Sequence, residues 1–226
     1  RRKITGVRDK LGIELADLRD VAAGEIGLGL VEYPGDRAVV TLTVDVTGND
    51  AKLNKLLSKV DKELMKRDST KDSAEFANVE LTIYTIPPQG EKDIERTAIY
   101  FVKDNMLCAC DSRNEAEQII RRFEGGACLA DIKPYQATMQ QCEQESDGID
   151  PQLRWYLDPF GYARSVRSFD AVDEKTRGKD YVKILSSQGF EAVQGAGGYV
   201  SLSVGGAFEM LHRTSVYAPP VEGAEE

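Results

Sequence analysis

The sequence predicts an α+β protein in which antiparallel sheets carry helices packed on one face. Three apolar or alternating segments, 79–86, 96–102 and 106–110, follow one another through short polar turns, as the strands of an antiparallel sheet do. Segments with apolar residues at helical spacing lie before and after this group. A similar order of one helix and three strands recurs near Leu53 and near Tyr181, which predicts a duplicated helix-plus-three-strand unit.

The chain is expected to have four parts. These are an N-terminal helix within residues 1–23, a first α+β half at 24–126, a second half at 127–217 and a tail or linker at 218–226. With 226 residues, of which 41% are hydrophobic, the chain can bury a core without disulfides. Because no long flexible segment separates the halves, we expect one compact body.

The N-terminal part is predicted to form a helix and a hairpin. Apolar residues at helical spacing predict a helix over 11–22. Alternation in 26–31 and 39–46 predicts two strands joined by a turn at residues 34–36. Gly27 and Gly29 leave one side of the first strand bare, where we expect a covering helix or a large cross-strand side chain, with close approach of a ligand as the alternative.

The best-patterned helix follows this hairpin. Leu53, Leu56 and Val60 share one face, and Asn49 or Asp50 can cap the helix. The polar run 67–75 after it is expected to be a loop.

The strand at 96–102 is apolar on both faces, so we expect it to be central and covered on both sides. Ser112 and Glu115 have the spacing of a capping box, which predicts a helix that ends at residues 125–126.

The second half is predicted to begin with a helix at 131–144, whose Pro134 lies in the first turn, and a strand at 153–157. Asp158 can cap a helix that starts at Pro159. The charged stretch 170–179 is expected to be a loop. The last helix, 181–189, is expected to have Gly189 as its C-cap.

Alternation in the final strands predicts that Val200 and Leu202 face the core while Tyr199 and Ser201 face water. Gly195, Gly197 and Gly198 nearly match a dinucleotide-binding loop, but Val200 stands where the third glycine belongs and a strand follows it. We therefore interpret these glycines, and Gly205 with Gly206, as hairpin glycines.

The composition excludes some classes of partner. A net charge of −9 and a pI near 4.9 argue against nucleic acids and anionic membranes, which bind basic surfaces. No apolar run is long enough to span a membrane, so no membrane insertion is expected.

With a single histidine in the sequence, any histidine-dependent mechanism must use His212. His212 shares a strand face with Met210 and Thr214, so we expect a hydrogen-bonded core residue, with a catalytic role as the alternative. Trp155 and Tyr156 could line a binding surface, although a role as core anchors is favoured.

Four cysteines are too few and too irregularly spaced for a disulfide framework or a common zinc site. Cys108 and Cys110 lie on one side of their strand, and Cys142 lies on an apolar helix face. We expect mostly buried thiols, no metal and no cofactor. A bridge between Cys128 and Cys142 is opposed by the helix between them, and joint redox or metal use of the cysteines is the alternative.

Five phrases of the sequence carry a resemblance. They are G-E-I-G-L-G-L at 24–30, F-E-G-G-A-C-L-A at 123–130, R-W-Y-L-D-P at 154–159, Q-G-F-E-A-V-Q-G-A-G-G at 188–198 and H-R-T-S-V-Y-A-P at 212–219. Their order resembles an uncharacterised family, a domain of unknown function, of secreted or envelope-associated proteins typical of planctomycete-type bacteria. The resemblance implies an extracytoplasmic (periplasmic or secreted) setting and a longer parent protein, and it assigns no activity.

The leading hypothesis is a non-catalytic extracytoplasmic binding or structural module whose partner is a protein or another envelope macromolecule. The first alternative is a hydrolase or redox enzyme that uses His212 or the cysteines. The second alternative is a small-molecule or lipid carrier, which requires a large apolar cavity.

Overall fold

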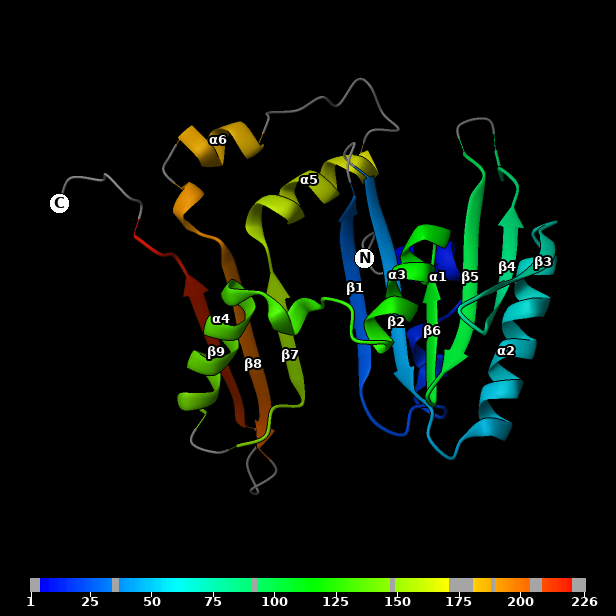
Figure 1. Cartoon of the computed structure of the whole chain (residues 1–226), viewed down its shortest axis with the longest axis horizontal. Helices are drawn as coiled ribbons and strands as arrows, with labels where there is room; N and C mark the ends of the chain where they lie inside the picture. The colour runs from blue at the N-terminus through cyan, green and yellow to red at the C-terminus, as the bar shows by residue number, and fades with distance from the viewer. Residues whose placement is uncertain are drawn as a thin grey trace. The chain divides into compact units, whose positions relative to one another are not determined.

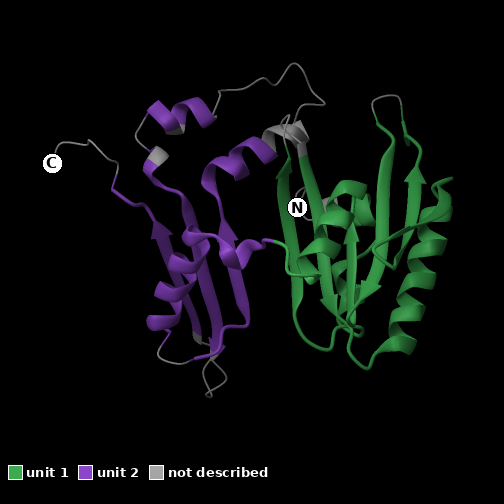
Figure 2. Cartoon of the chain, viewed as in Figure 1, with its two compact units in different colours: residues 1–33, 38–126 green, residues 34–37, 127–226 purple. Residues whose placement is uncertain are grey.

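A computed structural model of the chain describes residues 5–33, 37–90, 93–146, 149–170, 181–187, 190–203 and 209–220 (Figure 1). The chain divides into two compact units (Figure 2). Residues 1–33 and 38–126 form the first unit, and residues 34–37 and 127–226 form the second. The described residues form two antiparallel sheets and several helices, which confirms the α+β class.

The first unit contains a six-stranded sheet with the order β1-β2-β6-β5-β4-β3, called the large sheet below. Its strands are β1 (Ile26–Tyr33), β2 (Arg37–Asp45), β3 (Thr70–Phe76), β4 (Val79–Ile86), β5 (Arg96–Lys103) and β6 (Met106–Cys110). The strands predicted at 26–31, 39–46, 79–86, 96–102 and 106–110 are therefore confirmed, while residues 34–36 lie outside the described part of the chain.

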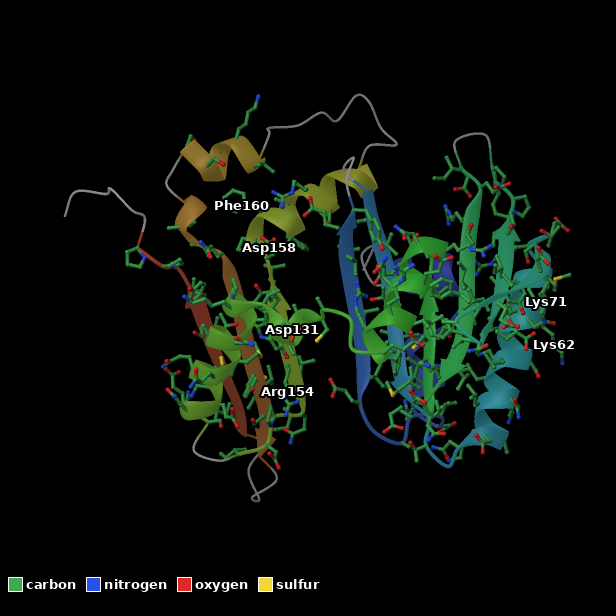
Figure 3. All side chains as sticks on the ribbon, in the orientation of Figure 1. Lys62, Lys71, Asp131, Arg154, Asp158 and Phe160 are labelled. Atoms are coloured by element: carbon green, nitrogen blue, oxygen red, sulfur yellow. The ribbon has the colours of Figure 1, made fainter. Side chains whose placement is uncertain are left out.

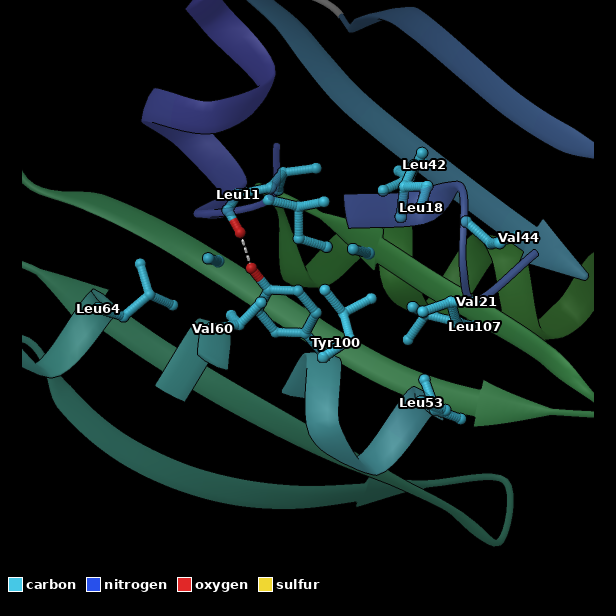
Figure 4. Close-up of a cluster of buried hydrophobic side chains, with 14 of the residues drawn as sticks. Leu11, Leu18, Val21, Leu42, Val44, Leu53, Val60, Leu64, Tyr100 and Leu107 are labelled. Atoms are coloured by element: carbon cyan, nitrogen blue, oxygen red, sulfur yellow. Dashed lines mark hydrogen bonds between the residues drawn. The ribbon is translucent and has the colours of Figure 1, made fainter. Parts of the chain in front are cut away.

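The large sheet has a hydrophobic core on each face. On β5, Ala98 and Tyr100 belong to one core, and Ile99 and Phe101 belong to the other. The first core packs under α1 (Thr5–Leu11), the 3₁₀ turn η1 (Leu15–Leu18) and α2 (Asp50–Met65), and Figure 4 shows the Tyr100 hydroxyl donating to the Leu11 carbonyl there. The second core packs under α3 (Arg113–Phe123). The prediction that residues 96–102 are covered on both sides is confirmed, and helices lie on both faces of this sheet rather than on one.

The predicted helix over 11–22 is wrong. The first helix ends at Leu11 because Gly12 adopts a left-handed conformation with φ 64°, and the Gly12 N–H donates to the Arg8 carbonyl. A short 3₁₀ turn then carries Leu18 into the core.

The predicted loop at 67–75 is also wrong, because β3 pairs along its whole length with β4. Its polar composition fits an edge strand whose side chains are mostly exposed. The helix before it is confirmed, with Asn49 at the N-cap position. The Asn49 side chain donates to the Val21 carbonyl rather than capping the helix.

The predicted capping box at Ser112 and Glu115 does not form, although Ser112 is the N-cap of α3. Glu115 is fully buried instead. Its carboxylate accepts hydrogen bonds from the Tyr33 hydroxyl at 2.5 Å and from Arg122 at 2.7 Å. These two partners compensate the cost of burying the carboxylate, which an N-cap contact would have left near water.

The second unit contains a three-stranded sheet with the order β7-β8-β9, called the small sheet below. Its elements are the 3₁₀ turn η2 (Leu129–Asp131), α4 (Lys133–Gln144), β7 (Leu153–Leu157), α5 (Pro159–Asp170), α6 (Tyr181–Ser187), the 3₁₀ turn η4 (Phe190–Ala192), β8 (Gly195–Ser203) and β9 (Glu209–Tyr217). Asp158 caps α5 as predicted, because its carboxylate accepts the N–H groups of Phe160 and Gly161 at 3.0 Å (Figure 3).

One face of the small sheet packs against α4, which lies over β8 and β9 in Figure 1. Met139 and Cys142 of α4 form a core with Tyr199. Tyr199 and Ser201 are buried, whereas Leu202 is exposed. The prediction that Val200 and Leu202 face this core is therefore wrong, because α4 covers the opposite face of β8.

The duplication stays unconfirmed. Four strands follow α2 in the first unit, whereas two described strands follow α6 in the second. The described residues thus do not show the recurring order of one helix and three strands. Of the loop predicted at 170–179, Asp170 is the last residue of α5, and residues 171–179 lie outside the described residues. Gly189, Gly205 and Gly206 also lie outside them.

Candidate functional site

The face of the small sheet opposite α4 is the candidate functional site, and we call it the outer face. Antiparallel pairing aligns Leu153 with Val200 and His212, and Trp155 with Gly198 and Thr214. Directly paired residues lie on the same side of a sheet. The outer face therefore consists of Leu153, Trp155, Leu157, Ala196, Gly198, Val200, Leu202, Met210, His212, Thr214 and Val216.

The outer face exposes large apolar side chains. Met210 is 69% exposed, and Leu153, Leu202 and Val216 are each 55% exposed. They come from all three strands, so the exposed apolar surface runs across the sheet. Scattered apolar residues are ordinary on protein surfaces, whereas a contiguous apolar patch is typical of an interaction site.

Three polar side chains meet near the middle of the outer face. The Trp155 indole donates from Nε1 to His212 Nε2 at 3.3 Å, and Thr214 Oγ1 lies 3.2 Å from the same nitrogen. Because an indole N–H can only donate, Nε2 is the acceptor in this contact. The sequence suggested a core position for His212, but the residue is exposed.

Gly198 makes the contact between Trp155 and His212 possible. A Cβ atom at position 198 would lie 2.6 Å from Trp155 Cε2 and 2.5 Å from the Arg213 carbonyl. Gly198 therefore leaves room for the indole to lie across β8 and reach β9. The interpretation of Gly195, Gly197 and Gly198 as hairpin glycines is wrong, since all three lie within β8.

The other two glycines serve the covered face. A Cβ atom at Gly195 would lie 3.0 Å from Pro134 Cβ, and one at Gly197 would crowd Met139 of α4. The strand β8 is rich in glycine because α4 packs closely on one face of it and the Trp155 indole packs closely on the other. This signal was present in the sequence but points to packing only once the neighbours are known.

Tyr156 does not join Trp155, because successive strand residues face opposite sides. Its ring packs edge-on against Tyr135 of α4, with 5.4 Å between ring centroids. The structure thus brings together two of the three candidate residues, Trp155 and His212, and places Tyr156 in the core side of the sheet.

The outer face lacks the constellation that hydrolysis requires. Thr214 lies at a suitable distance from His212 for a nucleophile and its base, but the Trp155 indole donates to the same imidazole nitrogen. The interactions found for His212 among the described residues involve Trp155 and Thr214, and neither is an orienting carboxylate. The described residues also contain no group of three or more His, Cys, Asp or Glu side chains arranged to hold a metal.

The cysteines are placed as buried thiols, apart from Cys128. Cys108, Cys110 and Cys142 are buried, and all four are free. Burial raises the pKa of the Cys108 thiol to about 12, and burial is also the main reason that the pKa of Cys110 rises to about 12. A raised pKa removes the thiolate needed for redox chemistry. The prediction of mostly buried thiols is confirmed.

A cleft lies in the first unit beside α2. This cleft has a volume of about 600 Å³ and is lined by Asn54, Leu57, Ser58, Val60, Asp61, Lys62, Lys71, Thr82, Tyr84 and Tyr100. Asp61 accepts hydrogen bonds from Lys71 at 2.7 Å and from Tyr84 at 2.6 Å, and these bonds lower the pKa of its carboxyl. Three polar side chains of the cleft, Asp61, Lys71 and Tyr84, are thus paired with one another. The mixed polar and apolar lining does not favour a lipid carrier.

None of the described helices has the length and apolarity needed to cross a bilayer. No known protein family matches the chain, and no curated protein is similar to it in sequence.

Proposed function

We propose that the chain is a non-catalytic binding module whose partner is another polypeptide, bound on the outer face of the small sheet. The observation that carries the proposal is the apolar surface of Leu153, Leu202, Met210 and Val216 around Trp155. We further propose an extracytoplasmic setting for this module, on the basis of the resemblance of its sequence phrases.

The chemistry of the outer face favours a polypeptide over a glycan. Its exposed groups are mainly aliphatic, whereas a sugar ligand needs many hydrogen-bonding groups directed at hydroxyls. The few polar side chains, Trp155, His212 and Thr214, already bond to one another. A sheet face of this kind is normally buried by a helix or by a second sheet, as α4 buries the other face.

The arrangement of the reactive side chains supports a non-catalytic role. His212 contacts a tryptophan and a threonine, and the raised pKa values of Cys108 and Cys110 keep those thiols protonated near neutral pH. A hydrolase or redox enzyme would need a base with an orienting partner or an accessible thiolate.

A comparison of three proteins tests the proposal. Wild type, Met210→Glu and Leu129→Glu are immobilised and exposed to a cell-envelope extract from the organism that encodes the chain. Leu129 is 49% exposed and belongs to η2, beside α4, so it controls for a charge placed outside the outer face. Proteins retained by wild type are then purified and titrated singly, with fluorescence of Trp155, the only tryptophan, as the readout.

We expect a purified polypeptide whose binding changes Trp155 fluorescence and weakens by about tenfold or more in Met210→Glu, because a charge placed within an apolar interface is costly. Leu129→Glu should bind as wild type does. The proposal fails if no purified polypeptide distinguishes the two variants. It also fails if envelope glycans or lipid vesicles, tested alone, give the Met210-dependent signal.

A further inference from the structure

The two edges of the large sheet differ in chemistry. The edge strand β3 has the sequence T-K-D-S-A-E-F, and its charged side chains are exposed. Charged residues on an edge strand discourage pairing with another strand. The edge strand β1 has the sequence I-G-L-G-L-V-E-Y, with a single charge at Glu32. Ile26, Leu28 and Leu30 on β1 are between 38% and 55% exposed.

The backbone of these three residues points toward the edge of β1 that no described strand pairs with. The Asp45 N–H on β2 donates to the Glu25 carbonyl, while the Val46 N–H donates to the Asn105 carbonyl on the β6 side. Hydrogen bonding alternates along an antiparallel strand, so odd residues of β1 bond to β2. Gly27 beside Thr43 and Gly29 beside Thr41 fit this register. The N–H and C=O groups of Ile26, Leu28 and Leu30 therefore point away from β2.

We propose that two copies of the chain associate through their β1 edges, antiparallel, with Leu28 of one copy opposite Leu28 of the other. This register also sets Ile26 opposite Leu30 and Gly27 opposite Gly29. The N–H and C=O groups of Ile26, Leu28 and Leu30 in one copy then face the same groups in the other copy, as antiparallel pairing requires. A strand that adds to an exposed edge is a recurrent mode of protein association.

The uncharged centre of β1 and its symmetric register fit a second copy as the occupant. Two copies carry the same net charge of −9, so a contact between them needs an uncharged centre, and residues 26–31 provide one. In an alternative register, with Gly29 of one copy opposite Gly29 of the other, Ile26 would lie opposite Glu32. The proposed register pairs Ile26, Leu28 and Leu30 only with one another. A two-fold axis makes such a contact self-complementary and closes the assembly at two copies.

The paired area predicts a weak dimer. One strand edge with three partly exposed side chains is smaller than the roughly 800 Å² that each partner contributes to a standard stable interface. We therefore expect a dissociation constant in the micromolar range, on the order of 10 μM.

Sedimentation equilibrium of the full chain from about 1 to about 200 μM measures this association. Leu28→Lys places two lysines at the two-fold axis, so its dissociation constant should rise by about tenfold or more. Ile94→Lys is the matched control, because Ile94 is 65% exposed and lies outside β1. Met210→Glu on the outer face should dimerise as wild type does, which separates this proposal from the proposed function. A thermal melt of each variant checks that it is folded.

Cysteine cross-linking in a Cys128→Ser background tests the register. Opposed residues of an antiparallel pair lie about 5.5 Å apart between Cα atoms, which is within disulfide range. Leu28→Cys should cross-link to itself. Ile26→Cys should not, but it should cross-link when mixed with Leu30→Cys.

Three results would overturn the dimer. The first is a monomer throughout the concentration range. The second is a dimer that Leu28→Lys leaves unchanged, and the third is self-linking of Ile26→Cys. Hydrogen exchange supplies a further check, since slow exchange at Leu28 in a monomeric sample would mean that another segment of the same chain occupies the edge.

Discussion

The large sheet and the small sheet differ in how their faces are covered. The large sheet buries apolar side chains on both faces, under α1, η1 and α2 on one side and α3 on the other. The small sheet buries one face under α4, while Met210, Leu202 and Val216 on the other face stay exposed. Each sheet contains a strand with apolar alternation, β2 in the large sheet and β8 in the small sheet. The alternation therefore marks a surface that favours burial without saying what buries it.

This comparison separates stability from binding. Side chains that are buried under helices on either face of a sheet contribute to the free energy of unfolding. Apolar side chains on an uncovered face contribute little to it and remain available to a partner. The four predictions below test this division, beginning with the largest expected effect.

Leu107→Ala in the large sheet should lower the free energy of unfolding by about 2–5 kcal/mol, because Leu107 is fully buried and its loss leaves a cavity. Leu202→Ala on the outer face should change it by less than about 0.5 kcal/mol. Urea unfolding followed by far-UV circular dichroism measures both, and Trp155 fluorescence reports the small sheet separately. An equal cost for Leu202→Ala would mean that the outer face is already covered.

Gly198→Ala should destabilise the small sheet by about 1–3 kcal/mol, because the added methyl group meets both the Trp155 indole and the Arg213 carbonyl. The emission of Trp155 should shift as well. Gly90→Ala is the matched control, since a Cβ atom there has no neighbour within 4 Å. An unchanged emission spectrum in a folded Gly198→Ala protein would contradict the placement of the indole across β8.

His212→Gln should lower the free energy of unfolding by no more than about 1 kcal/mol, since the glutamine amide oxygen can accept from the Trp155 indole. Thermal melting and Trp155 fluorescence measure the effect. A screen with ester, peptide and glycoside substrates provides the contrary test. A hydrolytic activity that disappears in His212→Gln while the melting temperature holds would make the protein an enzyme centred on His212.

The Asp61 carboxyl should make the first unit slightly acid-sensitive. Hydrogen bonds from Lys71 and then from Tyr84 lower its pKa below the usual 3.8. A lowered folded-state pKa contributes stability that is complete above the unfolded value and is lost as the pH falls through the folded value.

Solvent screening limits the Asp61 contribution to less than about 1 kcal/mol. Urea midpoints near neutral pH and near pH 3 should therefore differ slightly less in Asp61→Asn than in wild type. Asp20→Asn, at an exposed residue, is the control. An equal pH dependence in Asp61→Asn and wild type would contradict the prediction.

The sequence by itself determined the α+β class and most of the strands. Local signals were sufficient where a side chain binds the backbone of residues next to it in the sequence. At Asp158, before Pro159, the carboxylate caps α5 in this way. The wholly apolar strand β5 was likewise predicted to be central, because apolar side chains on both faces need cover on both faces. The short-range pattern also found α2 and the pairing of β4, β5 and β6.

Tertiary contacts decided the pairing of β3, the position of Glu115 and the exposed face of the small sheet. The polar strand β3 forms because β4 supplies its hydrogen bonds, and Glu115 leaves the helix cap because Tyr33 and Arg122 bind it in the core. Alternation in β8 gave two candidate faces, and the position of α4 decided that Tyr199 is buried and Leu202 exposed. Trp155 reaches His212 across Gly198, a contact between three strands that no local pattern contains. A sequence pattern specifies what each face of a strand prefers, but only the packing of distant elements determines which face is satisfied and which remains open to a partner.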